Sequence, residues 1–253
     1  MEETTPNHKP YGPAATVAVT LVIYIAAQLL AGVLISIIPF LRHWTSAQTT
    51  AWLQDNVWAM FAFVAIIESI TLGLLYMFLR QRKLSFSSLG LDKAKTRYIL
   101  YALSGFGVYF VLYIIGLLLV KIVAPGLNLD QKQEIGFSAS ASGRQLVPIF
   151  LSLVILPPVT EEIVARGFLF GGLRTKLPFV TAAVITSIMF AAAHLGETTG
   201  GLLWVGAIDT FILSLVLCYL REKTGSLWPS IGVHMIKNGL AFIVLFNIVQ
   251  YIR

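Results

Sequence analysis

The chain has 253 residues, of which 57% are hydrophobic and only 12% are charged, and its net charge is +6. A soluble domain carries about 45–50% apolar and about 25% charged residues, so this chain has too little polar surface to cover a water-soluble globule. The positive charge does not indicate a nucleic-acid partner, because the basic residues lie mostly between apolar segments and form no basic arm with interleaved aromatic residues. These properties predict an integral membrane protein.

Seven apolar segments follow one another, each long enough for a transmembrane helix, which needs about 20 mostly apolar residues. They span residues 14–41, 57–79, 98–124, 146–173, 178–195, 200–220 and 229–252. The first is too long for a signal peptide, and its leader carries Glu2 and Glu3, so we expect it to remain as an anchor. The pattern predicts an all-α fold, a polytopic bundle of about seven or eight transmembrane helices.

The positions of lysine and arginine predict how this bundle is oriented. If the N-terminus is cytoplasmic, the cytoplasmic segments hold most of these residues, including the cluster from Arg80 to Arg97. The positive-inside rule favours this orientation, which puts the C-terminus outside for seven helices and inside for eight. The stretch 125–144 is then an outer connection. We expect a multi-pass protein of a bacterial cell membrane.

Polar residues inside the apolar segments mark the part of the chain that carries chemistry. A charged side chain at the bilayer centre costs at least about 2.5–3.5 kcal/mol on insertion scales, so such residues are expected to be paired, to face a wet cavity or to have a function. Most of them lie in the second half of the chain, which suggests a scaffold half and a working half. They are Glu68, Glu161, Glu162, Arg166, His194, Asp209, His234, Lys237 and Asn238.

Glu161 and Glu162 lie near the middle of the segment 146–173. Adjacent helical residues point about 100° apart, so the two carboxylates cannot share one task equally. Glu162 and Arg166 are four residues apart and can form an ion pair, which leaves Glu161 as a candidate general acid or base. Both glutamates could instead belong to an ion-pair network between helices. Pro157 and Pro158 precede them and free backbone carbonyls, which is tolerated only against protein or a water-filled cavity.

Two further pairs of residues are spaced one helical turn apart. Phe190 and His194 share a face, with three alanines between them that let a neighbouring helix approach closely. His234 and Asn238 share a face of the last segment and could hold a water or polarise a carbonyl. Either pair could also be a hydrogen-bonded core contact. Distances along the segments place Glu161, His194 and His234 at similar depths, which would allow their side chains to meet.

These residues resemble the motifs of the CPBP family (also called Abi), which includes the CAAX endoproteases that trim prenylated proteins. The family pattern is Glu-Glu-x-x-x-Arg, Phe-x-x-x-His and His-x-x-x-Asn, and here it corresponds to Glu161-Glu162…Arg166, Phe190…His194 and His234…Asn238. The lead-in at 224–230 also matches bacterial members. The resemblance divides the chain into a cytoplasmic leader (1–13), a scaffold half (14–145) and a catalytic membrane core (146–253).

The resemblance implies an intramembrane endopeptidase without a bound cofactor. Glu161 would activate the attacking water, His194 would help to hold it, and His234 and Asn238 would stabilise the oxyanion. Glu162, Arg166 and Phe190 would support the site. The partners would be membrane lipid and a lipidated or hydrophobic peptide or protein, with no nucleic acid. The residue before the arginine is commonly phenylalanine in the family and is Ala165 here, which leaves the substrate preference open.

Three alternatives remain at the level of sequence. Two histidines and a glutamate resemble a zinc site, although no His-Glu-x-x-His pair is preset on one helix. Glu68, Asp209, His194 and Lys237 could instead form the relay of a proton-coupled transporter, although the two halves show no inverted repeat. A non-enzymatic membrane scaffold or bacteriocin-immunity protein could also retain the motifs. The roles of Glu68 and Asp209, the need for prenylation and the oligomeric state are not determined.

Overall fold

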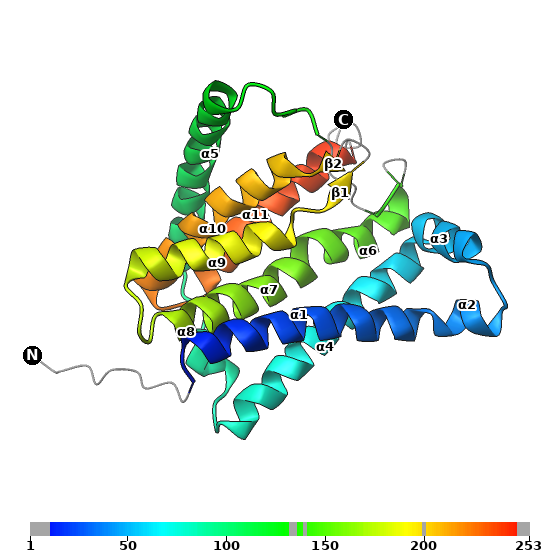
Figure 1. Ribbon diagram of the computed structural model, residues 1–253, viewed down its shortest axis with the longest axis horizontal. Helices are drawn as coiled ribbons and strands as arrows, with labels where there is room; N and C mark the ends of the chain where they lie inside the picture. The colour runs from blue at the N-terminus through cyan, green and yellow to red at the C-terminus, as the bar shows by residue number, and fades with distance from the viewer. Residues whose placement is uncertain (1–10, 132–135, 139–140, 199–200, 247–253) are drawn as a thin grey trace, which may run out of the picture.

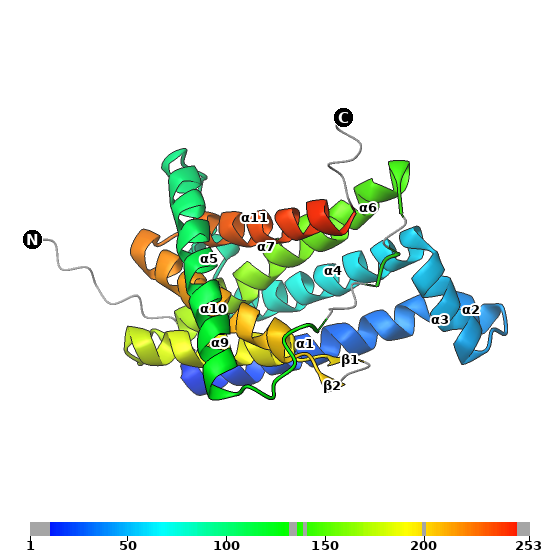
Figure 2. The ribbon, with the colours of Figure 1, turned by 90° about the horizontal axis from the view of Figure 1, so that it is seen from above.

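The computed structural model describes residues 11–131, 136–138, 141–198 and 201–246 and confirms the all-α membrane bundle (Figures 1 and 2). Two antiparallel strands of two residues each, Glu197–Thr198 (β1) and Gly201–Leu202 (β2), form the only sheet within these ranges. The helices before the central span are α1 (Pro13–Ile35), α2 (Ile37–Leu41), α3 (Ser46–Asp55), α4 (Val57–Gln81), the 3-10 turn η1 (Phe86–Leu89) and α5 (Arg97–Val123). After it come α9 (Phe179–Ala193), α10 (Trp204–Thr224) and α11 (Trp228–Leu245).

The central span is one helical path in six parts. It begins with the 3-10 turn η2 (Gly143–Gln145) and runs through α6 (Leu146–Phe150), the π-helical η3 (Leu151–Ile155), α7 (Leu156–Glu162), the π-helical η4 (Ile163–Phe170) and α8 (Gly171–Leu173). Pro157 and Pro158 supply no backbone N–H, so the regular bonding pattern cannot continue through them. The wide π turns therefore flank the short α-helical segment that carries both glutamates, and such turns are frequent at functional sites.

Five of the seven predicted spans are long and apolar enough to cross a membrane: Pro13–Leu41, Val57–Gln81, Arg97–Val123, Gly143–Leu173 and Trp204–Thr224. The segment predicted at 178–195 forms α9, which has 15 residues and at 1.5 Å per residue reaches only about 22 Å of a core about 30 Å thick. The segment predicted at 229–252 forms α11, with 18 residues and three strongly polar side chains near its middle. Residues 247–252 of that prediction lie outside the described residues, as do Glu2 and Glu3.

The first predicted span differs from expectation because it breaks at Ser36, between α1 and α2. Pro39 lies four residues after Ile35 and has no N–H to donate to the Ile35 carbonyl, which explains the break. The surface helix α3 was not predicted. It begins with a capping box, in which Thr45 and Gln48 each bond to the other's backbone N–H.

The central span lies between two groups of helices (Figures 1 and 2). On one side α1 and α4 pack against each other and against the central span, and on the other α9, α10 and α11 cover it. In both views α5 crosses the other long helices steeply, and it packs on α10 and α11. In the most apolar 18-residue window of each helix, 44% of the residues of the central span are buried, against 6% of those of α5. The bundle is therefore built around the segment that carries Glu161 and Glu162.

The loop after α4 is fastened to the turn between α10 and α11. Leu227 N–H donates to the Gly90 carbonyl, Arg221 donates to the Leu89 carbonyl, and Ser226 Oγ donates to Asp92 at 2.5 Å. The Ser226 hydroxyl stabilises the charged carboxylate and holds the pKa of Asp92 below its ordinary value. These bonds place the connection between α4 and α5 at the same end of the bundle as the start of α11.

We expect Gly90→Ala to destabilise the fold. Gly90 has φ +92°, and an added Cβ would lie 2.6 Å from the Arg221 guanidinium carbon and 2.8 Å from the Gly225 carbonyl oxygen. The left-handed backbone and the steric overlap together should lower the free energy of unfolding by at least about 2 kcal/mol, or roughly 4–8 °C in Tm in detergent. Gly73→Ala on α4 is the control, because nothing lies within 4 Å of its Cβ position. Equal Tm values for the two variants would contradict this account.

Candidate functional site

The Glu162 carboxylate is a fully buried charge of the predicted site. Its Oε1 accepts from Arg166 at 2.8 Å and lies 3.0 Å from Nδ1 of His234, which therefore donates to it. The side chains of Glu162 and Arg166 are both 0% exposed. The predicted ion pair is thus present, and α11 closes it from the other side. Because Nδ1 carries the proton, Nε2 of His234 points its lone pair, or a second proton, toward whatever lies on its other edge.

Glu161 lies on that other edge. Its Oε2 is 3.7 Å from Nε2 of His234, and its side chain is 30% exposed, whereas that of Glu162 is fully buried. One imidazole therefore lies between the two adjacent carboxylates, with a different nitrogen toward each. Glu162 is therefore paired with Arg166, whereas the side chain of Glu161 is partly exposed.

Phe190 lies at the centre of the remaining contacts. Its ring is 4.3 Å from the guanidinium carbon of Arg166, and its ring centroid is 4.6 Å from that of His194 and 6.0 Å from that of His234. Nδ1 of His194 is 2.8 Å from the Phe190 carbonyl oxygen. His194 therefore caps the end of α9 instead of lying within a full span. The ring packs between Arg166 and both histidines and so sets their spacing.

Asn238 lies one turn after His234 on α11, and its amide bonds to the central span. Nδ2 donates to the Leu153 carbonyl at 2.9 Å. The structure thus brings Glu161, Glu162, Arg166, Phe190, His194 and His234 into one connected group. Asn238 is attached to this group indirectly. It lies on α11 with His234, and it bonds to η3, which directly precedes the segment α7 that carries Glu161 and Glu162. The sequence predicted that Pro157 and Pro158 free backbone carbonyls, but not that Asn238 would bond to the carbonyl of Leu153.

The residues grouped as a transporter relay fall in two separate places. Lys237 Nζ is 2.8 Å from Oδ2 of Asp209, and the Tyr109 hydroxyl donates to Oδ1 of Asp209, so this cluster joins α5, α10 and α11. Glu68 on α4 lies against Thr160 and Glu161 of α7 on the other side of the bundle. Nothing in the sequence pointed to Tyr109, because a tyrosine in an apolar span has no local signature of its partner.

Within the described ranges, no three histidine, cysteine, aspartate or glutamate side chains are grouped closely enough to hold a metal ion. Nδ1 of His234 is engaged with Glu162, and Glu161 is the acid nearest to Nε2. The donor arrangement of a three-ligand zinc site is therefore not formed by these side chains. Hydrolysis without a metal stays a prediction.

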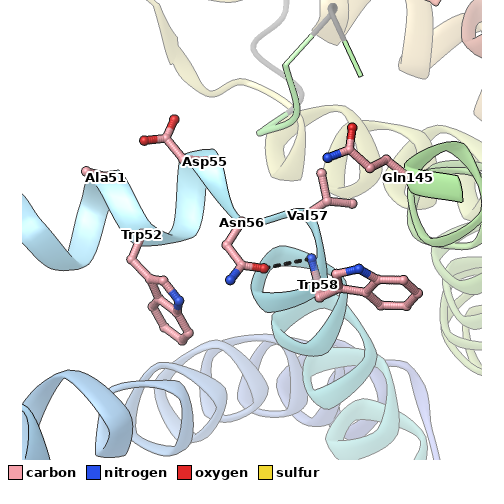
Figure 3. Close-up of a pocket in the computed structure, with 7 residues that line it drawn as sticks. All are labelled: Ala51, Trp52, Asp55, Asn56, Val57, Trp58 and Gln145. Atoms are coloured by element: carbon pink, nitrogen blue, oxygen red, sulfur yellow. Dashed lines mark hydrogen bonds between the residues drawn. The ribbon is translucent and has the colours of Figure 1, made fainter. Parts of the chain in front are cut away.

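Two cavities on the bundle lie outside this group of residues. A cavity of about 280 Å³ lies where α3 meets α4 and is lined by Trp52, Asp55, Asn56 and Gln145 among others (Figure 3). There Asn56 caps α4, because its Oδ1 accepts from the backbone of Trp58. A second, almost wholly apolar cavity of about 250 Å³ lies between α5, α9 and α10. Neither is lined by a predicted catalytic residue.

Comparisons with known proteins place the similarity in the central and C-terminal helices. Residues 143–240 match the family described as type II CAAX prenyl endopeptidase Rce1-like. A Bacillus subtilis (strain 168) protein named "Putative membrane peptidase YdiL" is 30% identical over 105 residues, which cover 41% of this chain and 39% of that relative. The chain therefore matches well under half of the relative's length. No solved structure matches the chain.

The ion pair between Lys237 and Asp209 should stabilise the fold mainly because each charge neutralises the other. We expect Asp209→Asn or Lys237→Met alone to lower the free energy of unfolding by about 2–4 kcal/mol, because each leaves a partly buried charge unpaired. The double variant should recover at least half of the lost Tm. Thermal unfolding of the four proteins in one detergent measures this, and additive losses in the double variant would show that the two charges do not interact.

Proposed function

We propose that this chain is an intramembrane endopeptidase, because residues 143–240 match the family described as type II CAAX prenyl endopeptidase Rce1-like. Its reaction is the hydrolysis of a peptide bond near the C-terminus of a lipidated (CAAX-type) or other membrane-embedded peptide. The observation that carries the proposal is the placement of His234 between a buried, neutralised Glu162 and an accessible Glu161. This arrangement separates the charge that holds the site together from the charge that can react.

Glu161 is the proposed general base. Its carboxylate takes one proton from a water, and the remaining hydroxide attacks the carbonyl carbon of the scissile bond. His194 helps to hold this water, with its ring oriented by the bond between Nδ1 and the Phe190 carbonyl. When the tetrahedral intermediate collapses, the carbon–nitrogen bond breaks and the proton on Glu161 passes to the leaving amine. A base that returns its proton in this way is regenerated at the end of each turnover.

His234 and Asn238 are the proposed oxyanion stabilisers. Asn238 can donate the N–H that it does not give to Leu153, and His234 can donate from Nε2 when its ring carries both protons. Donors held in place before the reaction are often the largest single contribution to catalysis. The ion pair of Glu162 with Arg166 supports this arrangement, since Glu162 holds Nδ1 of His234 and Arg166 packs on Phe190.

A site enclosed by membrane helices also favours the proposed substrate class. A lipidated or apolar C-terminal segment would enter from the bilayer, whereas the surrounding lipid would exclude a soluble folded protein. Arg174, Lys176 and Arg221 lie at the end of the bundle where α1 begins, because Gly12 adjoins Lys176 and Arg174 pairs with Glu222 of α10. The positive-inside rule then supports a cytoplasmic N-terminus in the cell membrane.

We expect Glu161→Gln to abolish peptide cleavage. Purified protein in detergent is incubated with a panel of lipidated and unlipidated C-terminal peptides, with and without a chelator, and products are measured by mass spectrometry. Loss of the base should lower kcat by about 100-fold to 10,000-fold, with no effect of the chelator. Glu222→Gln makes the same chemical change at the surface ion pair with Arg174 and should cleave like the unmodified chain.

Other outcomes of that experiment would redirect the assignment. Cleavage lost to the chelator would establish a metal-dependent enzyme. Absence of cleavage for every peptide, with all proteins equally well folded, would overturn the endopeptidase proposal. In that case proton-coupled transport and a non-enzymatic role in the membrane become the functions to test.

A further inference from the structure

The backbone carbonyl of Leu153 has no donor from its own helix. A helical carbonyl accepts from the N–H three, four or five residues later, in a 3-10, α or π turn respectively. For Leu153 these positions are Leu156, Pro157 and Pro158. Leu156 N–H donates to the Leu151 carbonyl, and neither proline has an N–H. All three helical routes to this carbonyl are therefore closed by the sequence of the span.

Asn238 supplies the missing donor from another helix. Its Nδ2 lies 2.9 Å from the Leu153 carbonyl oxygen, and the side chain is half-buried. A buried carbonyl without a hydrogen-bond partner costs about 1–3 kcal/mol. This cost is larger in a membrane interior, where no water can replace the missing donor. The contact is therefore strongly held. It fixes the plane of the Asn238 amide and ties α11 to η3, one turn from His234.

We propose that Pro157 and Pro158 are positioning residues that act through Asn238: by withholding two N–H groups they keep the Leu153 carbonyl free to orient the Asn238 amide. One N–H of the amide binds this carbonyl, and the second is held at a set angle for the oxyanion. The proposal rests on the proposed endopeptidase function for its consequence in catalysis. The contact itself is independent of that function.

This role differs from that of a proline that only kinks a helix. If the prolines merely shape the path of the central span, replacing them changes the position of Glu161 and has no special relation to Asn238. If they act through Asn238, an alanine N–H at 157 or 158 competes for the Leu153 carbonyl and releases the amide. A misplacement of about 1 Å of a catalytic group can lower a rate about 100-fold. The two explanations therefore predict different results when Asn238 is already absent.

A double-mutant cycle on kcat separates them. The four proteins are the unmodified chain, Pro157→Ala/Pro158→Ala, Asn238→Ala, and the combination of all three changes. We expect the proline changes to lower kcat by about 10-fold to 100-fold when Asn238 is present, with KM nearly unchanged, and by less than about 3-fold when Asn238 is alanine. Equal proline effects in both backgrounds would overturn the proposal.

A second cycle on Tm uses the same four proteins and needs no substrate. Asn238→Ala should lower Tm by roughly 2–8 °C in the unmodified chain, because the Leu153 carbonyl loses its donor. It should lower Tm by less than half as much in the alanine–alanine background, where the helix supplies an N–H. An undiminished loss there would overturn the competition for this carbonyl. If no peptide is cleaved at all, the endopeptidase assignment fails while this cycle still decides the contact.

Pro148→Ala is the matched control for both cycles. Pro148 is a buried proline of the same span, but it precedes Leu153, so a helical N–H at this position points back toward residues 143–145 and cannot compete for the Leu153 carbonyl. Its replacement should change neither kcat nor the Tm loss caused by Asn238→Ala. A Pro148→Ala effect as large as that of the 157/158 pair would show that any proline change in the span disturbs the site, and would count against the proposal.

Discussion

The structure depends on the shared contact of Arg166 and His234 with one oxygen of Glu162. All three groups are almost completely buried within a membrane bundle, where an unpaired charge is far more costly than in water. Satisfying Glu162 requires the central span and α11 to be adjacent and in one register. Phe190 then brings the end of α9 into the same place by packing on Arg166 and His234. A single neutralised carboxylate thus helps to define the arrangement of three helices.

The irregular backbone of the central span has a local cause and a long-range result. Two consecutive prolines interrupt the helical bonding, and the chain responds with π turns on both sides of α7. In lipid the freed groups must find other partners, and the amide of Asn238 is one of them. The same feature that breaks the helix therefore attaches it to its neighbour, close to the residues proposed for catalysis.

The polar residues of the membrane interior divide into two groups of different character. Glu161, Glu162, Arg166, His194 and His234 form a group around a partly accessible carboxylate, and Glu68 borders it from α4. Asp209, Lys237 and Tyr109 satisfy one another and join α5 to the bundle. The second group behaves as a structural tie.

The sequence alone determined the membrane class and the helical content, because these follow from composition. It also determined the pairing of Glu162 with Arg166, because this follows from spacing within one helix. The shared faces of Phe190 with His194 and of His234 with Asn238 follow from spacing in the same way. It also predicted most of the long spans, although α9 is too short to cross a bilayer and α3 was missed. Tertiary structure decided which nitrogen of His234 would face each glutamate, that Asn238 would bond to Leu153, and that Tyr109 would pair with Asp209. Such contacts join residues 72 to 100 positions apart in the chain, and no local pattern encodes which helix faces another. That choice is made by packing, where every buried charge and freed carbonyl must find its partner at once.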